Sequence, residues 1–254
     1  MRRKLLIGNW KMNGSLELAR QMAARLMPMV RPEVALWLCP SALHATGLAQ
    51  LAADSGLGWG MQDISAQPDG ARTGEHSVRM AGELGARCAI VGHSERRAYH
   101  GETDQLVADK ARACLEGGLL PVVCLGERME ERAAGQTDAV LARQLAPVLA
   151  SVPSEDWYRL VIAYEPVWAI GSGQAAGSAE IAAAHAGIRR LIDQAAPGLG
   201  DKVSVLYGGS LCAGNAAAVF STPGVDGGLA GGASLRPGEF ADIYQLALQY
   251  LGEQ

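Results

Sequence analysis

The sequence has few aromatic residues, no long apolar run and no run of like charges. Aromatic residues make up 5% of its 254 positions, so its core must be built mainly from aliphatic side chains. No stretch of about 18 apolar residues occurs, and the sequence therefore predicts no membrane-spanning helix. A net charge of −4 without basic runs argues against a nucleic-acid partner and against an anionic membrane surface.

The cysteines indicate neither a disulfide framework nor a metal site. They are five in number, which is odd, and they include no CxxC pair. Three of them, Cys39, Cys88 and Cys124, fall within apolar runs, and the other two are Cys114 and Cys212. We therefore expect reduced thiols, no bound metal and a cytoplasmic location.

Short apolar runs alternate with amphipathic stretches along the whole chain. These runs are mostly continuous, which is typical of parallel strands that are buried on both faces. They predict eight strands, at residues 5–8, 34–39, 57–62, 88–92, 120–125, 160–165, 203–207 and 227–230. A helical pattern follows each run, so we predict one (β/α)8 barrel domain with a closed parallel sheet over residues 1–254. An open doubly wound sheet is the competing fold, but no GxGxxG turn follows the first run.

Polar residues and glycines gather where the apolar runs end, which is where a barrel of this kind places its active residues. These candidates are Asn9, Lys11, Gln62, Asp63, His93, Glu95, Glu127, Glu165, Gly208, Gly209, Ser210, Gly231 and Gly232. Each has a structural alternative, since a lone lysine is usually solvated and a glycine pair is often an ordinary turn. A barrel would bring all of them around one mouth, and we therefore interpret them as one site.

Three side chains of this set suit a proton transfer between neighbouring carbon atoms. Glu165 stands at the end of a predicted strand, where a carboxylate could take a proton from carbon. His93 precedes a helical turn whose dipole disfavours the imidazolium, so we expect a neutral ring that polarises a carbonyl. Lys11 could hold negative charge on the substrate. These groups need neither a metal nor an organic cofactor.

Two glycine-rich turns, at 208–210 and 231–232, predict a phosphate site. Barrels frequently bind phosphate after strands seven and eight, where backbone N–H groups and a helix N-terminus point at the anion. Ser210 and Gly171 could supply further donors. A phosphorylated small molecule is therefore the expected substrate.

Five segments together closely resemble the triosephosphate isomerase family. They span nearly the whole chain in the order and spacing of that family, and any one of them alone would be far less specific. The segments are GNWKMNG at 8–14, GHSERR at 92–97, AYEPVWAIG at 163–171, YGGS at 207–210 and GLAGGASL at 228–235.

The resemblance implies interconversion of dihydroxyacetone phosphate and D-glyceraldehyde 3-phosphate, in glycolysis and gluconeogenesis. It assigns Glu165 as the base, His93 as the electrophile, and Asn9 and Lys11 as substrate-binding residues. Glu95 would support Lys11. The phosphate-binding residues that it implies are Gly171, Ser210, Gly231 and Gly232. The family is typically a homodimer, so the loop at 70–75 around Thr73 is expected to reach into a partner subunit.

The resemblance also implies a lid that closes over the site and protects an enediolate intermediate from loss of its phosphate. The lid would comprise Pro166, Val167, Trp168, Ala169, Ile170, Gly171, Ser172, Gly173, Gln174, Ala175 and Ala176. Two positions depart from the family pattern. Gln174-Ala175-Ala176 stands where Lys-Thr-Ala or Lys-Ser-Ala is common, and Asp63 stands where Asn is usual. We expect Asp63 to lie near the dimer contact and the active-site lysine, and activity to survive both changes.

Two other functions remain open on the sequence. The same base and phosphate site would serve an isomerase of a four-carbon ketose phosphate, such as erythrulose phosphate. A barrel that binds phosphate without catalysis is the other alternative, although Glu165, His93 and Lys11 are all present.

Overall fold

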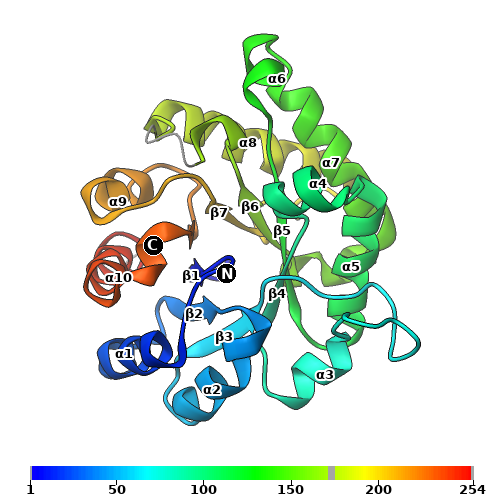
Figure 1. The fold of residues 1–254 in the computed structure, drawn as a ribbon. Helices are drawn as coiled ribbons and strands as arrows, with labels where there is room; N and C mark the ends of the chain where they lie inside the picture. Colours follow the sequence, from blue (N-terminus) through cyan, green and yellow to red (C-terminus); the bar gives the residue numbers. More distant parts are fainter. Residues whose placement is uncertain (1, 171–174, 253–254) are drawn as a thin grey trace.

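Eight parallel strands form a closed barrel at the centre of the molecule (Figure 1). The computed structural model describes residues 2–170 and 175–252. The strands are β1 (Leu5–Asn9), β2 (Ala35–Cys39), β3 (Gly58–Met61), β4 (Cys88–Val91), β5 (Leu120–Leu125), β6 (Val161–Tyr164), β7 (Ser204–Tyr207) and β8 (Gly227–Ala230). Each strand pairs with the next in parallel, and β8 returns to β1, where Leu5 pairs with Gly227. The predicted fold class, a (β/α)8 barrel, is confirmed.

Helices surround the barrel as an outer ring (Figure 1). The α-helices are α1 (Leu16–Leu26), α2 (Ala42–Ala52), α3 (Val78–Glu83), α4 (Ser94–His100), α5 (Asp104–Glu116), α6 (Met129–Ala133), α7 (Thr137–Ser151), α8 (Ser178–Ala195), α9 (Ala213–Phe220) and α10 (Pro237–Leu251). The described residues also form four 3₁₀ turns: η1 (Met27–Met29), η2 (Ser154–Arg159), η3 (Val167–Ala169) and η4 (Gly232–Leu235). None of the helices in the described ranges is long and apolar enough to cross a membrane.

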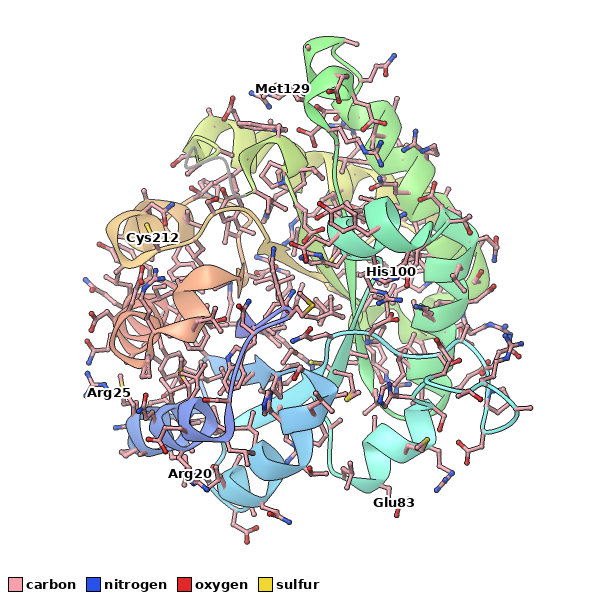
Figure 2. All side chains as sticks on the ribbon, viewed as in Figure 1. Arg20, Arg25, Glu83, His100, Met129 and Cys212 are labelled. Carbon is pink, nitrogen blue, oxygen red and sulfur yellow. The ribbon has the colours of Figure 1, made fainter. Side chains whose placement is uncertain are left out.

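Alternate residues of each strand point into the barrel and out toward the helices, which creates two apolar layers. Leu5 and Ile7 belong to the interior layer, whereas Leu6 belongs to the larger layer under the helices. Cys39, Cys88 and Cys124 lie in the interior layer as free thiols, as the apolar runs around them predicted. Cys212, just before α9, is exposed at the outer edge of the molecule (Figure 2).

His185 is a fully buried titratable group in α8. Its Nδ1 lies 3.1 Å from the carbonyl oxygen of Gly224, and its ring meets the ring of Tyr164 edge-on at 6.0 Å. Burial is the main cause that lowers the pKa of His185 to about 4; the Gly224 hydrogen bond opposes it, and the nearby charge of Arg189 adds a smaller lowering. The folded protein therefore holds this ring neutral at a pH where the unfolded chain would protonate it.

We predict that His185 makes folding stability depend on pH. Above about pH 6.5 both states hold the ring neutral; as the pH falls from there toward 4 the unfolded state takes up the proton first, so stability is lost. Between pH 7.5 and pH 5 this group should lower the free energy of unfolding by about 2 kcal/mol. His185→Asn can still donate a hydrogen bond to Gly224 but does not titrate. Over the same pH range its free energy of unfolding, measured with urea at fixed protein concentration, should therefore fall by about 2 kcal/mol less than that of the wild type. Equal losses for both proteins would contradict the prediction.

Candidate active site

A cavity of about 510 Å³ opens at the C-terminal ends of the strands and brings the predicted site residues together. It is lined by Asn9, Trp10, Lys11, Asn13, His93, Glu95, Glu165, Ile170, Gly208, Gly209, Ser210, Leu211, Leu229, Gly231, Gly232, Ala233, Leu235 and Arg236. Every predicted catalytic residue is in this lining, as are Ser210, Gly231 and Gly232 from the predicted phosphate site. Gly171, the remaining predicted phosphate contact, lies outside the described residues.

Glu165 directly follows β6 and is 1% exposed. Its Oε2 accepts a hydrogen bond of 2.8 Å from the backbone N–H of Ser94, and its Oε1 lies 3.0 Å from Nε2 of His93. Burial raises the pKa of this carboxyl group, but His93 and the Ser94 N–H outweigh burial, and the pKa is lowered overall. Glu165 is therefore ionised at neutral pH, and two groups at the end of β4 hold it in place.

His93 stands between β4 and α4 as the N-cap residue of that helix. Its Nδ1 accepts a hydrogen bond of 3.2 Å from the backbone N–H of Glu95, which requires an unprotonated Nδ1. Burial lowers the pKa of His93, yet the adjacent Glu165 carboxylate raises it above the ordinary value in this arrangement. The shift is therefore opposite to the one predicted from the helix dipole, and it comes from the Glu165 carboxylate 3.0 Å from Nε2.

Lys11 follows β1 in a left-handed backbone conformation, with φ of 53°. Few non-glycine residues adopt this conformation, so it is a local strain that the surroundings must hold. Oδ1 of Asn9 accepts the backbone N–H of Lys11 at 3.0 Å, and the amide of Gln62 donates to its carbonyl at 2.9 Å. These two bonds aim the side chain into the cavity, where Nζ lies 2.6 Å from Oε1 of Glu95.

Glycines make room for Glu165 on both sides. A β-carbon at Gly126 would overlap the carbonyl oxygen of Glu165, and one at Gly208 would lie 3.0 Å from its Cγ. Across the cavity, a β-carbon at Gly231 would be 3.4 Å from Cε of Lys11, whereas one at Gly232 would meet no atom within 4 Å. The strand ends are therefore closely packed around the carboxylate and open around Gly232.

The predicted lid begins at a buried Pro166 and continues into η3. The hydroxyl of Ser210 donates to the carbonyl of Ala169 at 2.7 Å, so Ser210 contacts the first part of the lid as well as the cavity. At the other end, the backbone N–H of Ala176 donates to the hydroxyl of Tyr207 at 3.3 Å. Gly171, Ser172, Gly173 and Gln174 of the predicted lid lie outside the described residues.

The cavity thus holds one buried carboxylate, one imidazole, one lysine and two glycine-rich turns. Among the described residues, no group of three or more histidine, cysteine or acidic side chains is arranged to hold a metal ion.

The chain matches the family model described as triosephosphate isomerase over residues 4–247. The chain belongs to the triosephosphate isomerase family. It is 47% identical to the triosephosphate isomerase of Cupriavidus necator over 246 residues, covering 96% of this chain and 99% of that protein. It is 47% identical to the triosephosphate isomerase of Bordetella pertussis over 244 residues, covering 95% and 96%. As a member of this family, the protein is an isomerase.

Several residues of the cavity wall were not identified from the sequence. Arg236 is one, and it stands just before the proline that opens α10, directly after the glycine-rich turn and η4. Its position directly after the glycine-rich turn is the sequence feature that could have identified it. Trp10 and Asn13 are others, within the segment of triosephosphate isomerase resemblance around Lys11. No periodicity marks them, because loop residues follow none.

Asp63, where triosephosphate isomerases usually have Asn, pairs with Lys110, while its neighbour Gln62 bonds to Lys11. Its carboxylate lies 2.6 Å from Nζ of Lys110 and 2.9 Å from Arg96. Lys110 is buried and pairs also with Glu102 at 2.6 Å. Asp63 therefore belongs to a compensated group of two acids and two bases behind the site, and it does not line the cavity.

The two carboxylates of this group differ in their pKa. Burial raises the pKa of Asp63, and the opposing effects of Lys110 and Arg96 do not cancel that rise. Burial also raises the pKa of Glu102, but hydrogen bonds from Lys110 and Arg96 lower it overall. The charged form of Glu102 is therefore favoured by folding, and that of Asp63 is not.

We predict that Glu102→Gln destabilises the protein by about 3 kcal/mol, because it removes a partner from a buried charge. Asp63→Asn, which restores the residue usual in the family, should cost less than about 1 kcal/mol and leave turnover unchanged. Urea unfolding of the two variants at pH 7 is the measurement. A larger loss of unfolding free energy for Asp63→Asn than for Glu102→Gln would contradict the prediction, because Asp63 would then be the more important partner of the buried charge.

Proposed function

We propose that the protein interconverts dihydroxyacetone phosphate and D-glyceraldehyde 3-phosphate. The observation that carries this proposal is the convergence of Glu165, His93 and Lys11 on one cavity whose other wall consists of glycine turns. Relatives at 47% identity bear the name triosephosphate isomerase. The reaction moves a proton between C1 and C2 of a three-carbon phosphate ester through an enediolate.

The phosphate would bind on the side of the cavity formed by Gly209, Ser210, Gly231 and Gly232. Loops after β7 and β8 are a frequent phosphate site in barrels, and η4 starts at Gly232 in this wall of the cavity. Lys11 adds positive charge beside Asn9 and next to Gly231. The sugar carbons would then lie between the phosphate and Glu165.

Glu165 would act as the base. To reach a carbon-bound proton, its carboxylate must leave the Ser94 N–H and His93 and move toward the substrate. Those two groups favour the charged carboxylate, so leaving them removes the causes that lower its pKa. The carboxylate then becomes a stronger base at the moment when it meets the substrate.

The same movement would prepare His93. The Glu165 carboxylate is the main cause that raises the pKa of His93, and without it burial and the charge of Lys11 favour the neutral ring. Nε2–H would then donate to the substrate oxygen, while the Glu95 N–H keeps Nδ1 unprotonated. Lys11 would offset the charge of the enediolate, and Glu95, 2.6 Å away, would hold the lysine in position until substrate arrives.

The lid, residues 166–176, would exclude water while the enediolate exists. Loss of phosphate from this intermediate is the competing reaction: its C–O⁻ becomes C=O, the double bond shifts by one carbon, and the C–O bond to phosphate breaks. The electron pair leaves with the phosphate, and the remaining enol tautomerises to methylglyoxal. A covered site disfavours this outcome.

We place this activity in glycolysis and gluconeogenesis, in the cytoplasm. The cysteines support a reducing compartment, because all five are free and four of them are buried.

We further propose a homodimer in which the loop around Thr73 enters the partner subunit. All residues from 67 to 76 are exposed, and the loop is closed at its base by a hydrogen bond from Ser65 N–H to the His76 carbonyl. Met12, next to Lys11, is 96% exposed, and Leu43 and Tyr99 are also uncovered. Apolar side chains exposed to this degree are what a subunit contact would cover.

The test of the reaction is a coupled assay with D-glyceraldehyde 3-phosphate, together with Glu165→Asp. Shortening the base by one methylene should lower kcat by about 100-fold and change KM much less, because the carboxylate no longer reaches the proton. Glu155→Asp, an exposed change in η2, is the matched control. Faster turnover of a tetrose phosphate would favour the four-carbon substrate, and equal losses in binding and turnover would argue against the role of Glu165.

The dimer is tested by sedimentation over a dilution series. The wild type should sediment at twice the 26.6 kDa chain mass, and Thr73→Arg should dissociate at much higher concentration, because the added charge would be buried at the contact. Ser154→Arg, on the exposed start of η2, should behave as the wild type does. A monomeric wild type, or an unchanged Thr73→Arg protein, would rule out this contact.

A further inference from the structure

Arg132 contacts the first part of the predicted lid and a residue of the helix that follows the lid. It belongs to α6, a short helix that stands beyond the ring of the other helices, where Met129 marks its outer edge (Figures 1 and 2). The side chain of Arg132 reaches back from this helix toward Trp168 in η3 and toward Glu180 in α8. One side chain therefore links three elements that are distant in the sequence.

The first contact is with the ring of Trp168. The guanidinium carbon of Arg132 lies 4.0 Å from the ring centroid, within the range of a cation–π interaction. The indole N–H of the same ring donates to Oε1 of Glu127 at 2.8 Å. Trp168 is thus held from its face and from its edge, three residues after Glu165.

The second contact concerns the charge of Glu127, which is fully buried. Oε1 of Glu127 accepts hydrogen bonds from Trp168 and from the hydroxyl of Tyr164 at 3.1 Å. Neither donor carries a charge. A guanidinium nitrogen of Arg132 lies 3.9 Å from the same oxygen and provides an opposite charge for the buried carboxylate.

The third contact is an ion pair between Arg132 and Oε1 of Glu180. The other oxygen of Glu180 accepts the backbone N–H of Gly177 at 2.8 Å, which caps the start of α8. Gly177 is the first residue after the predicted lid. The chain of contacts therefore runs from Glu127 through Trp168, Arg132 and Glu180 to Gly177.

We propose that Arg132 is a positioning residue that fixes the two ends of the lid relative to each other and to Glu165. The inference rests on the proposed isomerase function. With Arg132 in place, Trp168 and the start of α8 keep one relative position, and Trp168 holds Glu165, three residues before it, in line with the cavity. Without it, the enediolate is more often open to water and loses phosphate.

The test uses Arg132→Met, Arg132→Lys and Glu180→Gln. Methionine keeps the stem of the side chain without the charge, and lysine keeps a charge without the planar guanidinium. Glutamine at 180 can still cap Gly177 but carries no charge for Arg132. Each variant is assayed for kcat and KM with D-glyceraldehyde 3-phosphate and for inorganic phosphate released per isomerisation.

We expect Arg132→Met to lower kcat about tenfold and to raise phosphate release per turnover several-fold. Arg132→Lys and Glu180→Gln should show the same two changes to a smaller degree. The effects of Arg132→Met and Glu180→Gln should not multiply in the double variant, because both break one link. A purely structural role would lower the melting temperature without changing the ratio of phosphate released to product formed.

Arg190→Met is the matched control, since Arg190 lies in α8 as Glu180 does, is 55% exposed along its side chain and pairs with an exposed Asp138. It should match the wild type in all three quantities. An active wild type with unchanged kcat and phosphate release in Arg132→Lys and Glu180→Gln would overturn the inference, even if Arg132→Met fails to fold. A wild type without isomerase activity would overturn the proposed function and this inference with it.

Discussion

The contact between Glu165 and the end of β4 is the interaction on which the site depends. It joins residues 71 positions apart, and it requires that β4 and β6 end at the same height, on either side of β5. A closed parallel barrel provides this, because all eight carboxyl ends meet at one rim. The carboxylate is charged and almost fully buried, and the N–H of Ser94 and the imidazole of His93 compensate for the water that it has lost.

The same principle accounts for the other buried charges. Asp226, just before β8, is bound by Arg2 and Lys4 near the start of the chain and by Arg189 in α8. Burial raises the pKa of Asp226, but the Val205 N–H and these three cations lower it overall. Lys110 pairs with the carboxylates of Asp63 and Glu102, and Glu127 lies near the guanidinium of Arg132. Each of these buried charges is therefore matched by at least one opposite charge.

The sequence predicted the strands well because each is a nearly continuous apolar run. The predicted and observed ends of the strands differ by about one residue. For example, β6 ends at Tyr164, so Glu165 stands just beyond the strand. The cavity was predictable in turn, because polar residues directly after such runs have one place to go in a barrel. The position of Asp63 was not, since the partner lysine lies on α5 and no local pattern links residues 63 and 110. The link between Arg132 and Glu180 escaped for the same reason, as 48 positions separate them.

The glycines of the rim differ in how much they allow the protein to change. Gly126 and Gly208 adjoin Glu165 so closely that any side chain there would displace the carboxylate or its backbone. Gly232 faces open space at the mouth, on the wall to which we assign the phosphate. The two walls of the cavity therefore differ in how readily a substitution can adapt them to a new substrate. The wall beside the carboxylate is fixed by packing, whereas a side chain added at position 232 could take the place of a missing phosphate and let a smaller, uncharged sugar fill the site.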